Sequence, residues 1–185
     1  MNSPLTILGI AGSLRQGSYN RLTLRAAEQL LPDGAKIETF DLHSIPLFNQ
    51  DEEKSPPASV TEFKQRIRAA DAILIVTPEY NYGIPGVLKN AIDWASRPYG
   101  DNAWNDKPVA LMGASPGLLG TARAQILMRP LLSYLHMHTV NQPEVMIAKA
   151  HEKFDSQGNL TDEVSKKLMT QLLQNLVDWT KRLAK

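Results

Sequence analysis

Residues 72–94 read AILIVTPEYNYGIPGVLKNAIDW: an apolar run, a polar loop bounded by two prolines and a segment of helical pattern. The run AILIVT contains no charged residue, as expected for a strand that is covered on both faces of a parallel sheet. Pro85 then stands at a favoured first position of a helix. A strand that continues through a loop into a helix is the repeating unit of α/β folds. The stretch therefore predicts a parallel sheet with helices packed on it.

The same alternation extends along the rest of the chain. Between five apolar or β-branched runs lie segments whose apolar residues recur at helical spacing. This pattern predicts an α/β protein with a doubly wound, five-stranded parallel sheet, in the flavodoxin-like order 2-1-3-4-5, with helices on both faces. A chain of 185 residues is expected to form one domain, residues 1–185. The predicted strands are residues 6–12, 36–42, 72–78, 108–115 and 139–147, and the predicted helices are residues 20–31, 59–70, 85–96, 120–135 and 161–183.

Three helices carry local signals near their ends. Ser59 and Glu62 have the spacing of a capping box, which predicts Ser59 as the N-cap of the second helix. Pro130 lies inside the fourth helical segment and predicts a kink or an early break, because proline lacks the N–H donor. Thr161, followed by two acidic residues, is expected to start an amphipathic last helix.

The composition is that of an ordinary globular domain. Of the 185 residues 43% are hydrophobic and 21% are charged, and the net charge is +1. No basic cluster indicates nucleic-acid binding, and the lack of cysteine excludes disulfides and thiolate chemistry. Residues 5–12 are interpreted as a strand and not a signal peptide, and no apolar run approaches the roughly 18 residues of a membrane span. A cytoplasmic location is therefore expected.

The loop GSLRQGSYN, residues 12–20, joins the first strand to the first helix and is rich in hydrogen-bond donors. The amino end of the helix adds backbone N–H groups and the positive end of a dipole, so the loop predicts a phosphate site. It is not a Walker A loop, because no Gly-Lys-Ser/Thr follows. The alternative is a capped turn, in which one side chain only starts the helix. The donors are Ser13, Arg15, Ser18, Tyr19 and Asn20.

Two further loops follow the third and fourth predicted strands. Ligands of such sheets bind beyond the carboxyl ends of the strands, where the strand order reverses. Residues 78–83, PEYNYG, supply two tyrosines, a glutamate and an asparagine. Residues 113–125, GASPGLLGTARAQ, supply Ser115 and glycines that permit close backbone approach. Since tyrosines can cover a ring face and amides can satisfy ring heteroatoms, the three loops together predict a site for a phosphorylated flat ring system.

These three stretches, with the middle one extended to PEYNYGIPGVLKNAIDWASRP, resemble the motifs of NAD(P)H-dependent FMN reductases. This flavodoxin-like group includes bacterial quinone, azo and chromate reductases. The resemblance runs from about residue 5 to residue 147 and implies noncovalently bound FMN. It implies that the phosphate is held by Ser13, Arg15, Ser18 and Asn20, with Tyr19 adjoining. It also implies that Pro78, Glu79, Tyr80 and Asn81 line the isoalloxazine and that Ser115 and Gly117 approach it from the fourth-strand loop. Asn81 and Tyr82 are our own candidates for the residues that shape its stacking face.

The resemblance implies an FMN-dependent NAD(P)H oxidoreductase with a ping-pong reaction. NADPH or NADH gives a hydride to flavin N5 and leaves, and a quinone, a flavin, an azo compound or a metal oxyanion such as chromate then takes the electrons. Because the flavin carries the chemistry, no catalytic side chain is expected. Family members commonly form dimers or dimers of dimers, so a homo-oligomer, up to a homotetramer, is expected as well.

Two positions depart from the family pattern. Gly83 stands where many members carry serine, which removes one hydroxyl near the ring. Thr121 stands where a second glycine often follows Gly120, and it is expected to tighten the rim of the active site. Both departures are expected to bear on substrate preference and not on FMN binding.

Other interpretations of single motifs are weaker. Residues 113–117 match the G-x-S-x-G nucleophile elbow of α/β-hydrolases, but Pro116 has no N–H to give to an oxyanion hole. His136 and His138 share one strand face without an evident third ligand, so no metal site is expected. Asp41, at the end of the second strand, is interpreted as a strand-end cap or a solvated charge.

Two other classes of function stay open. A flavodoxin-type electron carrier would bind FMN without turning over NAD(P)H, although a near-neutral chain gives weak electrostatic steering to redox partners. A binding or scaffold module would not need the polar loops. The helix predicted over residues 85–96 has an apolar stripe that fits the core or a subunit interface equally well, and charges on its other faces that can pair across an interface. The stripe is Leu88, Ile92 and Trp94, and the charges are Lys89, Asp93 and Arg97.

Overall fold

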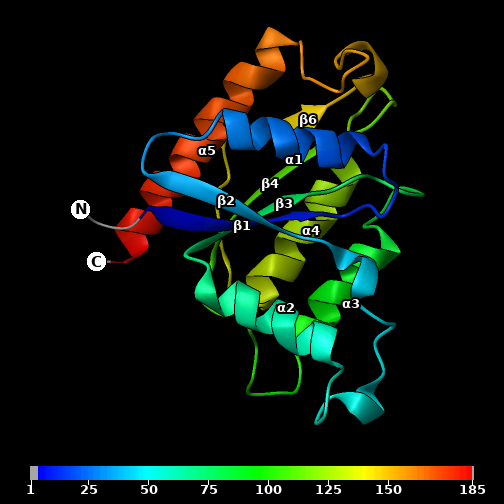
Figure 1. Cartoon of the computed structure of the whole chain (residues 1–185), viewed down its shortest axis with the longest axis vertical. Helices are drawn as coiled ribbons and strands as arrows, with labels where there is room; N and C mark the ends of the chain where they lie inside the picture. The colour runs from blue at the N-terminus through cyan, green and yellow to red at the C-terminus, as the bar shows by residue number, and fades with distance from the viewer. Residues whose placement is uncertain (1–3, 185) are drawn as a thin grey trace.

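The computed structural model describes residues 4–184 and contains one parallel sheet in the order β2-β1-β3-β4-β5, with β6 also paired to β4 (Figure 1). The predicted α/β class, doubly wound sheet and strand order are confirmed. The strands are β1 Leu5–Ala11, β2 Ala35–Phe40, β3 Ala72–Val76, β4 Pro108–Ala114, β5 His138–Thr139 and β6 Val145–Ile147. The helices are α1 Tyr19–Gln29, α2 Ala58–Ala69, α3 Gly86–Ala95, α4 Ala122–Tyr134 and α5 Glu163–Leu183, with short 3-10 turns η1 Leu42–Ser44, η2 Gln50–Glu52 and η3 Ala150–Glu152.

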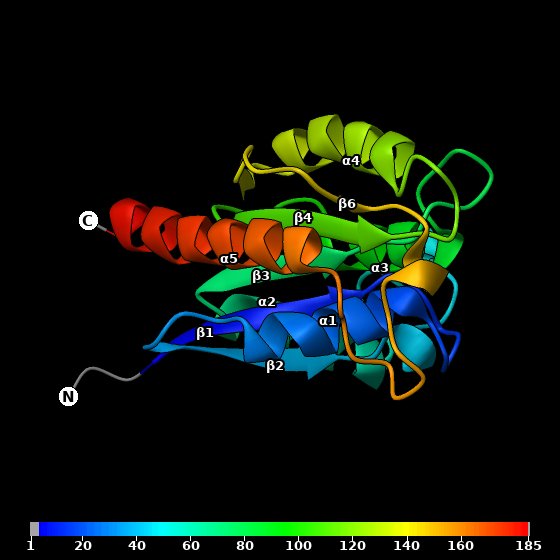
Figure 2. The same cartoon turned by 90° about the horizontal axis from the view of Figure 1, so that it is seen from above.

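Helices cover both faces of the sheet and create two hydrophobic cores. α1 and α5 pack on one face, whereas α2, α3 and α4 pack on the other (Figures 1 and 2). Along β3, Ile73 and Ile75 belong to the second core and Leu74 and Val76 to the first. Every residue of β3 and β4 is buried, which explains why both runs are apolar throughout.

The apolar stripe of α3 belongs to the core. Leu88, Ile92 and Trp94 are each about 1% exposed and pack against the sheet and α2. The indole N–H of Trp94 donates to the carbonyl of Pro46 at 2.9 Å, so this buried ring has no unpaired polar atom. Of the two interpretations of the stripe, core packing is therefore the correct one.

The fifth predicted strand, residues 139–147, is divided into two short pieces. β5 pairs with Pro108 and Val109 at one end of β4, and β6 pairs with Met112 to Ala114 at the other end. Pro143 lies between the pieces and cannot donate a hydrogen bond to a sheet, which accounts for the interruption. Together β5 and β6 occupy the fifth position of the predicted order.

Three helix predictions are corrected by the structure. Ser59 does not cap α2, because Pro57 occupies the N-cap position and Ser59 lies in the first turn. The cap of α5 is Asp162, one residue after Thr161, and its carboxylate accepts from the Ser165 N–H at 2.8 Å. α4 runs unbroken past Pro130 to Tyr134. Pro130 is exposed, so water can satisfy the carbonyl that loses its helical donor.

The carboxyl ends of the three central strands meet at one edge of the sheet, on the right of Figure 2. Hydrogen bonds continue past the strand ends: the Gly12 N–H donates to the Val76 carbonyl at 2.8 Å, and the Thr77 N–H donates to the Met112 carbonyl at 2.9 Å. The loops that follow β1, β3 and β4 are therefore side by side.

Over residues 4–184, none of the helices is both long and apolar enough to pass through a bilayer.

Candidate functional site

The three loops enclose a pocket of about 470 Å³ at this edge of the sheet. Because each loop follows a different strand, the pocket exists only when the sheet is assembled. Ser13, Asn81, Tyr82 and Gly117 flank the pocket without lining it. The predicted residues that line it are Arg15, Ser18, Tyr19, Asn20, Pro78, Glu79, Tyr80 and Ser115, and Ala114 and Pro116 line it as well.

The first loop brings donors to the amino end of α1. Ser18 is the N-cap, and its hydroxyl oxygen accepts from the Asn20 N–H at 3.2 Å. The Ser13 and Tyr80 hydroxyls are 3.1 Å apart and hydrogen-bonded, which ties the first loop to the second. The Arg15 side chain is exposed, with its guanidinium carbon 5.7 Å from the ring centre of Tyr19. The alternative of a capped turn is thus correct for Ser18, but it leaves Arg15 and the other N–H groups of the first turn available.

Asn20 joins α1 to the end of β4. Its amide nitrogen donates to the Ala114 carbonyl and its amide oxygen accepts from the Ala114 N–H, each at 2.9 Å. The residue is 3% exposed, so both bonds are shielded from water. This bridge gives Asn20 a structural role that the sequence did not reveal, because both polar atoms of its amide are bonded to β4.

The second loop is a tight hairpin. The Tyr80 N–H donates to the Gly83 carbonyl at 3.2 Å, and the Gly83 N–H donates to the Tyr80 carbonyl at 2.9 Å. Between them Asn81 has φ 49° and Tyr82 has φ 65°, the two positive values of a type I′ turn. The turn holds Tyr80 half exposed beside the pocket and Tyr82 more exposed at the tip of the loop. A Cβ at Gly83 would come no closer than 3.7 Å to the Tyr80 carbonyl oxygen, so a serine fits there.

Glu79 connects the second loop to the helix that follows the third. Its carboxylate accepts from the backbone N–H groups of Arg123 at 2.9 Å and Ala124 at 3.2 Å, which places it at the amino end of α4. It also pairs with the Arg123 guanidinium at 3.1 Å. Arg123 in turn lies over the Tyr82 ring, 3.6 Å from its centre. Arg123 is absent from the predicted site residues, because nothing in a helical pattern shows a contact 44 positions away.

In the third loop the Ser115 hydroxyl has a local partner. Its hydroxyl oxygen accepts from the Gly117 N–H at 3.1 Å, and its backbone bonds to Ile147 and Ala150. Within residues 4–184 no histidine side chain is hydrogen-bonded to Ser115, and Pro116 supplies no N–H. The loop therefore lacks the parts of a hydrolase nucleophile elbow.

Thr121 lies beneath the third loop and not at its rim. Its side chain is 0% exposed and its hydroxyl oxygen accepts from the Gln125 amide at 3.0 Å. Gly113 faces this hydroxyl so closely that a Cβ there would overlap both Thr121 and the Thr77 carbonyl. The expectation that Thr121 narrows the rim is wrong, because its side chain points down against β4.

Asp41 has an ordinary structural role at the start of η1. Asp41 caps η1 by accepting from the His43 N–H at 2.9 Å, and it pairs with Arg21 at 2.7 Å. Burial alone would raise the pKa of Asp41, but these two partners outweigh it and hold that pKa below its ordinary value. Across the described residues no cluster of histidine and acidic side chains is arranged to bind a metal, His136 and His138 included.

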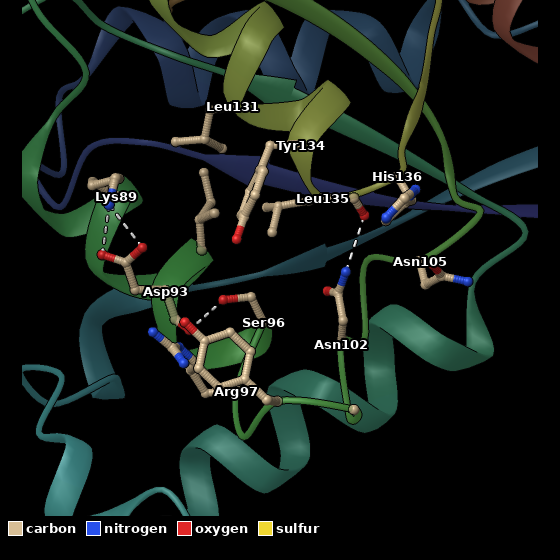
Figure 3. Close-up of a pocket in the computed structure, with 13 residues that line it drawn as sticks. Lys89, Asp93, Ser96, Arg97, Asn102, Asn105, Leu131, Tyr134, Leu135 and His136 are labelled. Carbon is tan, nitrogen blue, oxygen red and sulfur yellow. Dashed lines mark hydrogen bonds and ion pairs between the residues drawn. The ribbon is translucent and has the colours of Figure 1, made fainter.

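A larger hollow, of about 700 Å³, lies between the carboxyl-terminal halves of α3 and α4 (Figure 3). None of the three predicted loops contributes to it. Lys89 pairs with Asp93 of the same helix at 2.7 Å, and Arg97 stacks on Tyr99, 3.9 Å from the ring centre. Lys89 and Asp93 are thus paired with each other, and Arg97 has an aromatic contact. The smaller pocket is lined by the three predicted loops and is therefore the candidate cofactor site. The larger one is a groove on the surface between two helices.

Comparison with known proteins agrees with this geometry. The model of the NADPH-dependent FMN reductase family matches residues 5–152. The chain is 51% identical to an NAD(P)H-dependent FMN reductase of Pseudomonas aeruginosa, over 99% of each chain. It is 40% identical to a 2-hydroxy-1,4-benzoquinone reductase of a Burkholderia species, over 96% of this chain and 97% of that one.

A solved structure is similar over almost the whole chain. The flavoenzyme NAD(P)H:(acceptor) oxidoreductase FerB of Paracoccus denitrificans superposes with a TM-score of 0.86 at 37% identity, covering 96% of this chain and 98% of its own. The fold, the three loops and the sequence comparisons therefore agree. The chain belongs to the NADPH-dependent FMN reductase family.

Proposed function

We propose that this protein is an FMN-dependent NAD(P)H oxidoreductase that binds FMN in the pocket at the carboxyl edge of the sheet. The single observation that carries the proposal is the meeting of the loops after β1, β3 and β4 around one pocket of about 470 Å³. Family membership supports the same cofactor and the same reducing substrate, NADPH or NADH. The proposed acceptors are small molecules: quinones, flavins, azo compounds or metal oxyanions such as chromate.

The side chains of the pocket fit a phosphorylated flavin. No acidic residue stands in the first turn of α1, so the positive end of this helix is available for an anion. The carboxylate that lines the pocket, Glu79, is already paired with Arg123. Arg15 adds donors at the same end. At the other end Tyr80 offers an aromatic surface for a flat ring.

When bound, FMN supplies the redox chemistry by accepting a hydride from NAD(P)H and passing two electrons to the acceptor. The protein itself binds and orients. Arg15 and the amino end of α1 hold the phosphate, and the Ser13–Tyr80 hydrogen bond fixes the phosphate end relative to the ring end. We assign no side chain as a catalytic acid or base. We propose that both substrates use the same exposed side of the site in turn, which is compatible with a ping-pong reaction.

The test separates an enzyme from a flavodoxin-type electron carrier. The purified protein is loaded with FMN, its visible spectrum is recorded, and NADPH and NADH oxidation are followed with benzoquinone as the acceptor. We expect a yellow protein that oxidises the nicotinamide and shows parallel lines in double-reciprocal plots. FMN binding without nicotinamide oxidation would identify a carrier instead. A protein that stays colourless with FMN would refute the proposal.

Arg15→Ala tests the phosphate end of the site. We expect FMN binding to weaken by about 1.5–3 kcal/mol, the value of a hydrogen bond to a charged group. The measurement is quenching of flavin fluorescence on titration. Arg182→Ala on the exposed carboxyl end of α5 is the matched control, since it removes the same charge far from the pocket. Equal affinities of the two variants would remove Arg15 from the site.

We also propose that the protein is a cytoplasmic homo-oligomer, a dimer or a dimer of dimers, in which residues 1–185 form one domain. The exposed face of α4 supports an interface, because Ile126, Leu127 and Tyr134 are 59%, 50% and 77% exposed and lie at helical spacing. The groove of Figure 3 continues this face toward α3. Multi-angle light scattering at micromolar concentration distinguishes the monomer, the dimer and the tetramer, and a monomer would contradict this part of the proposal.

A further inference from the structure

Glu79, Arg123 and Tyr82 form a stack beside the pocket that FMN binding does not explain. Glu79 lines the pocket, and Tyr82 lies two residues beyond Tyr80, which also lines it. Arg123 is held between them, at 3.1 Å from the Glu79 carboxylate and 3.6 Å from the centre of the Tyr82 ring. The three residues, called here the Glu79–Arg123–Tyr82 stack, come from the loop after β3 and from the first turn of α4, which meet only in the folded chain.

Glu79 can bind the amino end of α4 without the Arg123 side chain. Its carboxylate already accepts from two backbone N–H groups at the amino end of α4, those of Arg123 and Ala124. A carboxylate that accepts from the first N–H groups of a helix in this way needs no guanidinium. With a 10% exposed side chain, Glu79 is also a nearly buried anchor, whereas the Arg123 side chain is 35% exposed. The charge of Arg123 is therefore presented to solvent at the side of the pocket.

The Arg123 guanidinium has more N–H donors than its bond to Glu79 uses. A guanidinium carries five N–H groups in a planar fork. Among the described residues, Glu79 is the side chain that accepts a hydrogen bond from this guanidinium, and it uses one nitrogen. The Tyr82 ring covers one face of the fork and restricts its orientation. The remaining N–H groups can therefore be directed at an acceptor atom of a ligand beside the pocket.

The charges around the stack favour an anionic partner. Glu79 offsets both Arg123 and the amino end of α4, but Arg15 and the amino end of α1 contribute positive potential to the same pocket. No acidic residue lies in the first turn of α1 to offset it. Glu79 is the one acidic side chain among those that line the pocket in the described part of the chain. A neutral ring gains the aromatic contact alone, while a ring with an anionic oxygen also gains a charge-assisted hydrogen bond.

We infer that the Glu79–Arg123–Tyr82 stack is a specificity element of the acceptor site, in which Arg123 selects planar ring acceptors that carry an anionic oxygen over neutral rings of the same shape. The inference rests on the proposed function, because it takes the pocket to hold FMN. Arg123 contacts the acceptor, Tyr82 fixes the plane of its guanidinium, and Glu79 is a positioning residue that anchors it.

Binding of a matched pair of rings that cannot be reduced tests the inference apart from turnover. Naphthalene-2-sulfonate and naphthalene-2-sulfonamide have nearly the same shape and differ in charge. They are titrated into the FMN-loaded protein by isothermal calorimetry. We expect Arg123→Met to weaken sulfonate binding about tenfold or more, the effect of losing a charged hydrogen bond, and sulfonamide binding by less than about twofold. Arg129→Met, on the same helix but paired with Glu144, is the control and should change neither value.

The same variants are then assayed with a quinone and its sulfonated analogue. Arg123→Met should lower kcat/KM for the sulfonated quinone selectively, and Arg123→Lys should restore part of the loss. Equal effects on both rings in the binding experiment would overturn the inference, as would a loss of FMN affinity in Arg123→Met. A weaker binding of NADP⁺ with unchanged sulfonate binding would also overturn it, by assigning Arg123 to the nicotinamide substrate. A wild-type protein that fails to take up FMN refutes the proposed function instead, which keeps the two failures distinct.

Discussion

Tyr82 shows how single residues of the site depart from ordinary local preferences. Its φ of 65° lies in the left-handed region, where type I′ turns normally place glycine. A side chain in that region costs on the order of 1–2 kcal/mol. Backbone strain of this kind persists where the surrounding structure fixes it, and here the Arg123 contact and the two Tyr80–Gly83 hydrogen bonds do so. The strain keeps an aromatic ring at the tip of the loop, where glycine would leave none.

Two substitutions of Tyr82 separate the backbone cost from the loss of the ring. Tyr82→Asn and Tyr82→Val both remove the ring, but asparagine tolerates the left-handed region and a β-branched residue does not. We expect Tyr82→Val to have a free energy of unfolding about 1–2 kcal/mol lower than Tyr82→Asn, measured by urea titration. The same pair at Tyr99, an exposed tyrosine stacked with Arg97 and without a positive φ, should differ far less. Equal differences at both positions would contradict a strained turn.

At the scale of elements, polar side chains connect the loops to the helices and strands around them. Asn20 bridges α1 and β4, Glu79 bridges the β3 loop and α4, and the Ser13–Tyr80 pair bridges the first two loops. Such bonds are worth most where water is excluded, because an unmade bond there leaves a buried group without a partner. The site is therefore held by the elements on which it lies and not by its loops alone.

Asn20→Ala is expected to destabilise the protein by about 2–4 kcal/mol, because it leaves both the N–H and the carbonyl of Ala114 unpaired in a buried position. The free energy of unfolding is measured by urea titration. Asn90→Ala is the matched control: Asn90 also makes two amide bonds, to Phe48 and Pro46, but in a more exposed position, so its loss should cost clearly less. Similar losses for the two variants would mean that burial of the Asn20 bridge is unimportant.

Gly113 and Gly86 predict opposite effects of adding one methyl group. A Cβ at Gly113 in β4 would overlap the Thr121 side chain and the Thr77 backbone carbonyl, so we expect Gly113→Ala to lower the free energy of unfolding by about 3 kcal/mol or more. At Gly86, in the first turn of α3, an added Cβ would meet nothing within 4 Å, and Gly86→Ala should raise stability by about 0.4–1 kcal/mol. Urea titration measures both. A stable Gly113→Ala variant would contradict the tight contact between β4 and the third loop.

At the scale of the whole molecule, a charged cluster ties α2 to the segment that follows α3. The Lys64 side chain is 5% exposed and its ammonium pairs with the Asp101 carboxylate at 2.5 Å; it also donates to the Arg97 carbonyl. Arg68 pairs with the same carboxylate. The Lys64 hydrogen bond, only partly opposed by burial, holds the pKa of Asp101 below its ordinary value of 3.8. The cluster thus closes the face of the molecule that carries α2 and α3.

The Asp101 cluster predicts a dependence of stability on pH. A carboxyl whose pKa is lower in the folded state stabilises it at pH values above the unfolded pKa, and this contribution is lost as the pH falls through the folded one. Asp101→Asn should lower the free energy of unfolding by about 1–2 kcal/mol at pH 6, less than for a fully buried pair because Asp101 is half exposed. The difference from wild type should shrink below pH 3.8. Urea titrations at pH 6, 4 and 3 measure it, and a difference that is constant with pH would contradict the prediction.

The sequence by itself determined the α/β class, the order of the strands and the three loops that carry the site. These features depend on local patterns: apolar runs for buried strands, helical spacing for the covering helices, and hydroxyls, glycines and tyrosines at the strand ends. The corrected details have local causes that compete with those patterns. Pro57 displaces Ser59 from the cap of α2, and Pro143 divides the last strand.

Only the tertiary structure decided which polar groups are hydrogen-bonded within the chain and which remain available to a ligand. The Asn20 bridge joins residues 94 positions apart, and the Glu79–Arg123 pair joins residues 44 positions apart. Such contacts depend on the register of parallel strands and on the direction in which each loop leaves the sheet. No periodicity along the chain encodes those two quantities. The sequence therefore predicts the three loops of the pocket, while the folded sheet directs Asn20 to β4, Thr121 to the interior and Arg123 to the side of the pocket.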